Sequence, residues 1–320
     1  RTKVSQAYTG PLHQSAANIF TDQLYLDSRK KFYVEPTRNN QTIVIPNLRP
    51  LNAISLLAQK SLSGNTNGGG YFFYETTKGY YFRSWESMIA SQGKYPRQAV
   101  QNFNYRLRNV KDRGLKLSMQ ERMSGVMEYE FIQNYDSATQ QAIGTYGHTV
   151  ITHNIYDKSY DEHKFNYHAR YNDFILVADT GLSDHLKQPI ADIPVDWDAE
   201  KNVSDYSDSK ISLYGTTQYL HNKETGVNGI DVKSDGETYA VKTMQRNSVV
   251  RGITVQLTVH GQSFLEAGDI INFNLRTVEP KGHSPVESDD PHLSGRYVIT
   301  AIRHRWTDID YRMILTCVRD

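Results

Sequence analysis

The chain reads VRGITVQLTVHGQSFLEAGDIINFNLRTVEP over residues 250–280 and, after a polar loop, SGRYVITAIRHRWTDIDYRMILTCV over residues 294–318. Apolar residues alternate with polar ones from Ile253 to Val259, which is the period of a strand with one buried face. Similar runs predict three more strands, at 270–275, 297–302 and 311–317. Four strands with short connections are typical of an antiparallel meander. Because a meander has to pair its edges or close on itself, this stretch predicts most of a small barrel.

The composition limits the class of protein. The chain has 320 residues, a length typical of about two domains. Its 36 basic and 35 acidic side chains nearly cancel, which argues against bulk electrostatic binding to DNA or to an anionic membrane. The single cysteine, Cys317, excludes an intrachain disulfide and a cysteine zinc cluster, and its alternating strand predicts a buried side chain. No apolar run approaches the roughly 18 residues that cross a bilayer, and no signal-peptide pattern opens the chain.

Residues 1–115 are expected to form an α/β domain. Apolar residues at helical spacing predict two helices, which begin at Gly10-Pro11 and near Pro50. The apolar stripes consist of Leu12, Ala16, Ile19, Phe20 and Leu24 in the first helix and Leu51, Ile54, Leu57, Ala58 and Leu62 in the second. Short strands are predicted at 32–34 and 42–45, each ended by a proline.

An aromatic hairpin follows in the same domain. The sequence YFFYETTKGYYFRSW, residues 71–85, has two aromatic runs on either side of a turn that contains Gly79. Ser84 is expected to cap a short helix, although the capping box is incomplete because Ser87 stands three residues on.

The rest of the chain predicts a barrel with an insertion. Segments 127–132 and 146–155 look like strands, and we expect residues 116–159 to complete the barrel of residues 250–320. Residues 160–249 are then an inserted mixed domain, with one strong strand at Phe174–Val177 and a helix from Glu237 to Val250 that leads into the first strand of the meander. The expected fold class is α+β, with a tube-like antiparallel β-barrel, a helix-and-hairpin domain and this insertion.

Histidine pairs are the first candidates for chemistry. His148 and His153 are five residues apart, and His163 and His168 repeat that spacing. On a strand this spacing places the two side chains on opposite faces, so neither pair is a natural metal site. Asp161, Glu162 and His163 together are better explained as a charged turn than as a cation site.

Acidic residues give three further candidates. Asp196, Asp198 and Glu200 alternate like calcium-loop ligands, but the glycine that such a loop needs is absent. Asp289-Asp290-Pro291-His292 lies between strands of the meander, where turn chemistry is the simpler interpretation. Glu128 and Glu130 fall on one face of a strand, which suits a carboxylate pair, although a polar face turned to water or to a partner explains them more simply.

Other motifs carry little chemistry. Gly68-Gly69-Gly70 precedes a strand, so it offers no helix N-terminus to a phosphate. The sequence has no nucleophile elbow, phosphate loop or dinucleotide fingerprint. A basic cluster is interpreted first as an exposed linker and second as a polyanion contact; it consists of Arg106, Arg108, Lys111, Arg113 and Lys116. We therefore predict no catalytic residue, no metal and no cofactor.

The order of these parts resembles a known family. A proline-flanked second helix at Pro50–Ile54 is followed by the aromatic hairpin and, near the end, by Gly268–Ile271, Ser294–Ile299 and His304. This order resembles the central baseplate hub protein of contractile-tailed bacteriophages and, more distantly, the base domain of VgrG-type secretion spikes. The resemblance covers nearly all of the chain, and its motifs are turns and strand ends.

The resemblance implies a homotrimer. In the family each subunit has two tube-like barrels, so that six barrels form a pseudo-hexameric ring between the tail tube and a trimeric spike. We identify one barrel, and the other is expected to precede Arg1. The implied partners are the chain itself, the tail tube protein, the trimeric spike or tail lysozyme protein, the baseplate wedge proteins and the tape-measure protein, with DNA only in transit. The implied location is the virion, after assembly in the host cytoplasm.

Two other hypotheses remain open. One is a tail-associated cell-wall hydrolase, which would bring together carboxylates such as Asp196 with Asp198 or Glu128 with Glu130. The other is a carbohydrate-binding β module, which would present tyrosines along one groove. The absence of a recognisable catalytic motif favours the structural hub.

Overall fold

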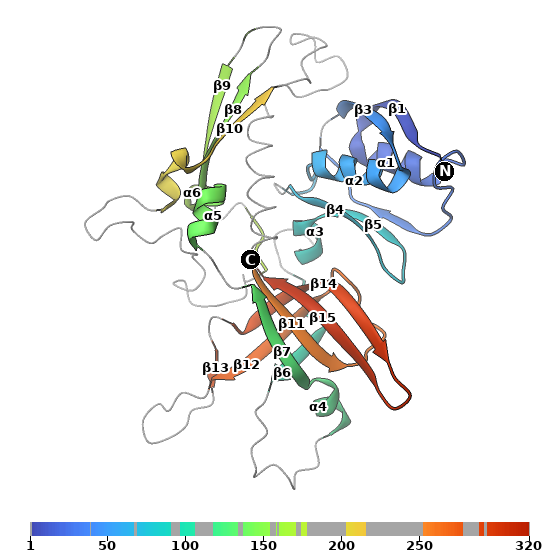
Figure 1. Cartoon of the computed structure of the whole chain (residues 1–320), viewed down its shortest axis with the longest axis vertical. Helices are drawn as coiled ribbons and strands as arrows, with labels where there is room; N and C mark the ends of the chain where they lie inside the picture. Colours follow the sequence, from blue (N-terminus) through green and yellow to red (C-terminus); the bar gives the residue numbers. More distant parts are fainter. Residues whose placement is uncertain are drawn as a thin grey trace, which may run out of the picture. The chain divides into compact units, whose positions relative to one another are not determined.

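The computed structural model describes residues 2–38, 40–66, 69–90, 97–105, 118–133, 137–153, 158, 160–170, 174–177, 203–215, 252–277, 288–290 and 293–319. The chain divides into two compact units (Figure 1). One unit comprises Arg1–Ser87, Ser137–Phe174 and Pro189–Ser248, and the other comprises Met88–Asp136, Ile175–Gln188 and Val249–Asp320. The described residues form helices together with parallel and antiparallel strand pairs, which confirms the α+β class.

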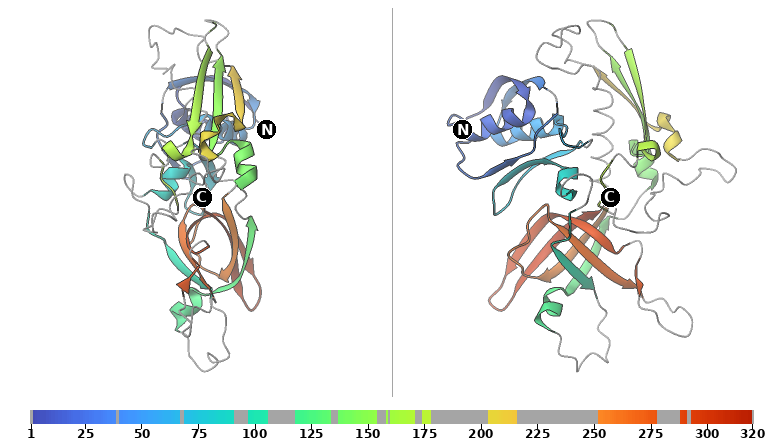
Figure 2. Two further views of the ribbon diagram at one scale, coloured as in Figure 1. Left: turned by 90° about the vertical axis from the view of Figure 1, so that its left-hand side faces the viewer. Right: turned by 180° about the vertical axis from the view of Figure 1, so that it is seen from behind.

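The C-terminal unit is built on one curled sheet. Its strands are β6 (Gln101–Tyr105), β7 (Val126–Gln133), β11 (Ile253–His260), β12 (Ile270–Thr277), β13 (Ser288–Asp289), β14 (Gly295–Trp306) and β15 (Tyr311–Arg319). The order is β13-β12-β14-β15-β11-β7, and β6 pairs in parallel with β12. The sheet curls until β6 approaches β7, where the Asn104 N–H donates to the Ser124 carbonyl oxygen at 2.9 Å. Figure 2 shows this curl, which contains the four strands predicted within residues 250–320 together with β7, and also β6, which the sequence did not predict.

Apolar side chains, which alternate with polar ones along the strands, fill the inside of this barrel. Val255, Leu257 and Val259 of β11 are buried, as the sequence predicts. The other buried members of the core are Phe103, Val126, Leu265, Ile271, Phe273, Leu275, Tyr297, Ile299, Met313, Leu315 and Cys317. A bulge between Ile299 and Ala301 shifts the register of β14 by one residue. Because a one-residue shift reverses the face of every later side chain, the bulge decides what the end of β14 presents.

The predicted strand order is wrong at one point. The predicted meander would place β11 beside β12. In the structure β11 pairs with β15 on one side and with β7 on the other. The connection from Gly261 to Asp269 does not form a hairpin; it crosses the end of the barrel, where Leu265 is buried. Gly261 makes this path possible, since its N–H donates to the Tyr311 carbonyl at 2.9 Å and a Cβ there would overlap the Tyr311 ring.

The chain that precedes β7 adds a short helix that the sequence did not predict. Helix α4 (Met119–Met123) has a complete capping box, in which the Glu121 N–H donates to the Ser118 side chain and the Glu121 carboxylate accepts from the Ser118 N–H. The side chain of Gln262 donates to the Met123 carbonyl at 2.7 Å. Helix α4 is therefore tied to the connection that crosses the barrel end.

The N-terminal part of the other unit packs two helices against two small sheets. The helices are α1 (Leu12–Thr21) and α2 (Pro50–Lys60). The sheets are β1-β3, with β1 (Val4–Pro11) and β3 (Asn40–Leu48), and β2-β5-β4, with β2 (Phe32–Val34), β4 (Tyr71–Glu75) and β5 (Tyr80–Ser84). Helix α3 (Trp85–Ile89) follows β5, and the Ser84 side chain accepts from the Ser87 N–H as predicted. Both predicted helices and the aromatic hairpin are confirmed.

Three details of this part differ from the prediction. Strand β3 continues through Pro46 instead of stopping before it. The register with β1 shifts at this point, so no hydrogen bond from the missing N–H of Pro46 is required. Leu24 is exposed because α1 ends at Thr21, and Leu51 is half-exposed in the first turn of α2. Strand β1 was not predicted at all.

A third sheet, β10-β8-β9, lies in the same unit as the N-terminal part. Its strands are β8 (Gly147–His153), β9 (Tyr160–Asn166) and β10 (Ile211–Gly215). The elements around it are α5 (Ser137–Ile143), α6 (Tyr167–Arg170), η4 (Val203–Asp205) and η5 (Ser207–Ser209). The prediction that 146–155 completes the barrel is therefore wrong, because β8 is the central strand of this separate sheet.

Two further predictions for the middle of the chain have different outcomes. Residues Phe174–Val177 are mostly buried, but no strand forms there. The helix expected from Glu237 to Val250 lies outside the described residues. The expected boundaries 1–115, 116–159 with 250–320, and 160–249 stay a prediction. No helix in the described ranges is long and apolar enough to cross a membrane.

Candidate functional site

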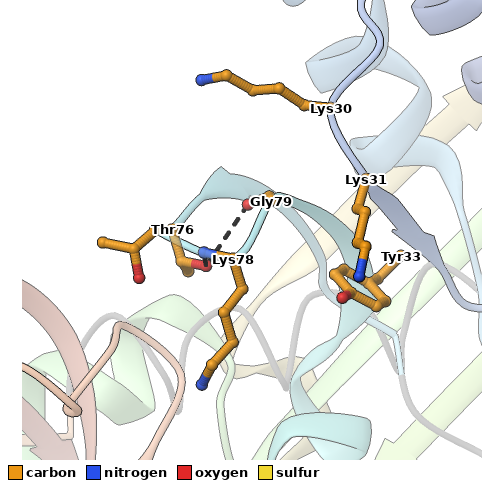
Figure 3. Close-up of a pocket in the computed structure, with 7 residues that line it drawn as sticks. Lys30, Lys31, Tyr33, Thr76, Lys78 and Gly79 are labelled. Carbon is orange, nitrogen blue, oxygen red and sulfur yellow. Dashed lines mark hydrogen bonds between the residues drawn. The ribbon is translucent and has the colours of Figure 1, made fainter.

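A pocket opens beside the turn between β4 and β5 (Figure 3). Its volume is about 470 Å³, and it is lined by Lys30, Lys31, Tyr33, Thr76, Thr77, Lys78 and Gly79. Three lysines give it a cationic wall, yet none of these seven lining residues is a carboxylate, an imidazole or a thiol. The lining therefore suits contact with an anion and supplies no acid–base pair for hydrolysis.

The turn that forms one wall of the pocket is held by backbone bonds. The Thr76 N–H donates to the Gly79 carbonyl at 2.8 Å, and the Tyr80 N–H donates to the Lys31 carbonyl at 2.9 Å. Gly79 has φ of +152°, and a Cβ there would lie 2.5 Å from the Lys31 carbonyl oxygen. A glycine is required by this close approach, in line with its predicted place in the turn.

An ion pair lies at the rim of the pocket. Lys30 and Glu75 form a hydrogen-bonded salt bridge. This hydrogen bond raises the pKa of Lys30 and lowers the pKa of Glu75. Both groups are exposed, so the pair adds little to stability.

Three tyrosines share the face of the β2-β5-β4 sheet that turns away from its core. Tyr33 stacks on Tyr81 with ring centroids 4.8 Å apart, and Tyr74 stacks on Tyr81 at 5.3 Å. The Arg83 guanidinium donates to the Tyr74 hydroxyl at 2.7 Å and lies 4.9 Å from the centre of the Tyr81 ring. Tyr81 lies between its two neighbours and under Arg83, so the central ring of the three offers no open face to a sugar.

The candidate carboxylate pair lies on the outside of the barrel. Glu128 and Glu130 are exposed on β7, where they face Thr258 and Gln256 of β11 across the sheet. The prediction that they share one face is confirmed. They stand on an open wall and not in the described pocket, which is a poor setting for a hydrolase.

The candidate histidines do not gather into a site. His148 is buried, and its Nδ1 lies 2.7 Å from the Gly144 carbonyl oxygen while its ring stacks on Phe165 at 4.9 Å. Burial lowers the pKa of His148. His153 and His163 lie on β8 and β9, and within the described ranges no group of three His, Cys, Asp or Glu side chains is placed to hold a metal.

The Asp289–Asp290 candidate is a structural turn. The Asp290 side chain accepts from the Leu293 N–H at 2.9 Å, and the Asp290 N–H donates to the Leu275 carbonyl at 2.7 Å. Several other candidates lie outside the described residues: Pro291, His292, Asp196, Asp198, Glu200, Gly68, Arg106, Arg108, Lys111, Arg113 and Lys116. The structure does not describe the side chain of His168 either.

Sequence reasoning missed the tip of the β14–β15 hairpin as a surface. Trp306 is 70% exposed and Ile309 is 98% exposed. Trp306 stacks on Tyr311 with centroids 3.7 Å apart, and Nδ1 of His304 lies 2.8 Å from the Tyr311 hydroxyl oxygen. The bulge at Ile299–Ala301 puts His304 and Trp306 on the core side of β14, but they lie beyond the end of the core. Trp306 and Ile309 are therefore two exposed apolar side chains at the tip of one hairpin.

Comparison with known proteins gives structural neighbours only. No family model matches the sequence, and no curated protein matches it. A tail protein from Neisseria meningitidis MC58 is similar with a TM-score of 0.48 and 9% identity, covering 100% of this chain and 70% of its own. The 43 kDa tail protein of prophage MuSo2 from Shewanella oneidensis is similar with a TM-score of 0.48 and 11% identity, covering 99% of this chain and 68% of its own. Scores and identities of this size do not assign the chain to a family.

Proposed function

We propose that this chain is a structural component of a bacteriophage tail, and within it a baseplate hub. The observation that carries the proposal is the curled sheet β6-β12-β14-β15-β11-β7, whose two edge strands approach each other at Asn104. A tube-like barrel of this kind is what the resemblance to baseplate hub proteins implies.

The motifs that carry the resemblance fall at structural points of that barrel. Gly268 precedes β12 with φ of +90°, and Gly295 opens β14 with φ of +133°. A Cβ at Gly295 would meet the Arg319 guanidinium at 3.1 Å. These motif residues are explained by backbone geometry and close packing, which is how motifs of a structural protein are expected to behave.

The hub acts in this proposal as a symmetry adaptor. Three copies form a ring with pseudo-sixfold symmetry that joins the tail tube to the trimeric spike and lets DNA pass. Wedge proteins surround the ring, and the tape-measure protein reaches it from the tube. Such a ring needs rigid walls and self-complementary surfaces, and it needs no catalytic pocket.

The test is assembly with the spike and tube proteins of the same phage. The chain is mixed with each, and the products are separated by size and weighed by light scattering. The proposal expects one complex that contains three copies of this chain and one trimeric spike. A chain that binds neither protein at micromolar concentration, and degrades peptidoglycan instead, contradicts it.

A further inference from the structure

The pocket beside the β4–β5 turn collects positive charge from two separate segments of the chain. Lys31 stands directly before β2, and Lys78 lies in the turn itself. Both side chains are exposed, and in Figure 3 both extend downward from the backbone, whereas Lys30 extends sideways. Only the fold brings these two lysines, which are far apart in the sequence, to one pocket.

Backbone contacts hold the two lysines in place. Strand β2 pairs in parallel with β5, and the Lys31 carbonyl accepts from the Tyr80 N–H at 2.9 Å. The close approach of Gly79 to the same carbonyl brings the turn against Lys31. The Lys78 N–H donates to the Thr76 side-chain oxygen at 3.2 Å. The two ammonium groups are therefore carried by a preformed backbone frame, which a ligand does not have to order.

The lining of the pocket keeps a net positive charge. Lys30 is bonded to Glu75 at the rim, and none of the seven lining residues is acidic. Lys31 and Lys78 thus add two further ammonium groups to a concave surface that has no acid of its own. A concave surface lined by one sign of charge concentrates ions of the other sign. A bound anion would also offset the repulsion between the two lysines.

Three properties of the lining select the class of anion. Ammonium groups are compact point charges that bind phosphate oxygens, and two of them match the double charge of a phosphate monoester. Hydroxyl groups of Thr77 and Tyr33 also line the pocket, and a hydroxyl can donate to an anionic oxygen. The volume of about 470 Å³ lies within the range of small-molecule pockets, roughly 300–1,000 Å³, so the pocket accommodates more than an inorganic ion.

We propose that this pocket binds the terminal phosphate of a small phosphorylated molecule, such as a sugar phosphate. A long polyanion is a poorer match, because the 36 basic and 35 acidic side chains of the chain leave no bulk positive charge along which its backbone could run. The site goes beyond the proposed hub and does not depend on it, since all the lining residues belong to one chain.

Isothermal titration calorimetry on the full chain at physiological salt tests the proposal. The probe is glucose phosphorylated on its primary hydroxyl, and the references are glucose sulfated at the same position and glucose itself. We expect the phosphate to bind at millimolar concentration or below, the singly charged sulfate to bind at least about threefold more weakly, and glucose to give no heat of binding. A phosphate that gives no heat at millimolar concentration, or binds no better than the sulfate, overturns the assignment.

Paired variants test the two lysines. Lys31→Ala with Lys78→Ala should weaken phosphate binding by at least about tenfold, because it removes two charged donors. The control, Arg38→Ala with Lys60→Ala, removes the same charge at exposed positions outside the lining and should change binding by less than about twofold. Equal binding by the double-lysine variant and the wild type contradicts the site.

Glu75→Gln tests the site in the opposite direction. It removes the carboxylate at the rim and releases Lys30, so phosphate binding should tighten by about threefold. A gain of affinity cannot come from a folding defect, and unchanged or weaker binding counts against the charge argument.

Lysine acetylation followed by mass spectrometry locates the bound phosphate. Lys31 and Lys78 should be acetylated more slowly when the glucose phosphate is present, while Lys60 should react at the same rate. Protection that is absent at Lys31 and Lys78 overturns the site, and so does a single-stranded oligonucleotide that binds the wild type more tightly than the glucose phosphate does. None of these measurements uses the spike or tube proteins, so a failure of the pocket leaves the proposed hub standing.

Discussion

Leu257→Ala tests the assignment of the barrel core. Leu257 is 0% exposed and pairs with Leu315 on β15 and Tyr129 on β7. Truncation of a fully buried leucine removes the transfer free energy of its side-chain carbons and leaves a cavity, for a loss of about 3 kcal/mol in the free energy of unfolding. A tenfold change in an equilibrium corresponds to ~1.4 kcal/mol, so the barrel should open roughly 100-fold more often.

Hydrogen exchange followed by mass spectrometry measures this opening in each unit separately. Peptides from β11 and β15 should exchange faster by that factor, whereas peptides from β8, in the other compact unit, serve as the reference. The control is Gln256→Ala, one residue away on the outer face between Thr316 and Glu130. It should cost less than about 0.5 kcal/mol. Equal acceleration by both variants would refute the assignment of faces.

Three further predictions concern individual residues. Gly79→Ala should destabilise the β4–β5 hairpin by about 2 kcal/mol, measured as a lower denaturation midpoint, since a Cβ would press on the Lys31 carbonyl; an unchanged midpoint counts against the close approach. Burial raises the pKa of the Cys317 thiol, so a maleimide at pH 7 should label it only after the barrel opens, and fast labelling of the folded chain would contradict its burial. Burial lowers the pKa of His148, so the neutral side chain stabilises the fold above the ordinary histidine pKa of ~6.5, and this stability is lost as the pH falls. Hydrogen exchange of β8, corrected for intrinsic rates, should therefore be faster at pH 5 than at pH 7, and the increase should be smaller in His148→Gln.

Five strands of the barrel, β7, β11, β12, β14 and β15, were predictable from sequence, but β6, β13 and the strand order were not. The alternation around Leu257 and Leu315 depends only on which face each strand buries, and that pattern is local. The partner of β11 depends on the path of Gly261–Asp269 across the barrel end, which rests on the contact of Gly261 with Tyr311. No local sequence pattern predicts that contact.

The middle of the chain was the hardest part to predict. Strand β9 contains Tyr160, Asp161, Glu162 and Lys164, and so much polarity hides the period of a strand. Phe174–Val177 has the opposite problem, since a short apolar run does not distinguish a strand from another buried segment. Tertiary packing decided both cases.

The candidate site was predictable in part. The shared face of Glu128 and Glu130 followed from spacing alone, and the register of β7 with β11 confirms it. The place of Trp306 was not predictable, because the bulge at Ile299–Ala301 moves it to the core side of β14, where it is exposed because it lies beyond the end of the core. A bulge has no reliable signature in a single sequence, so surfaces that depend on one need a structure.

The mass of the assembled particle tests the central claim most directly. Light scattering on the chromatographed chain, over a range of concentrations, gives the number of copies without assuming a shape. The proposed hub predicts a mass three times that of the subunit. A mass equal to one subunit at every concentration, unchanged when the trimeric spike protein is added, would contradict it.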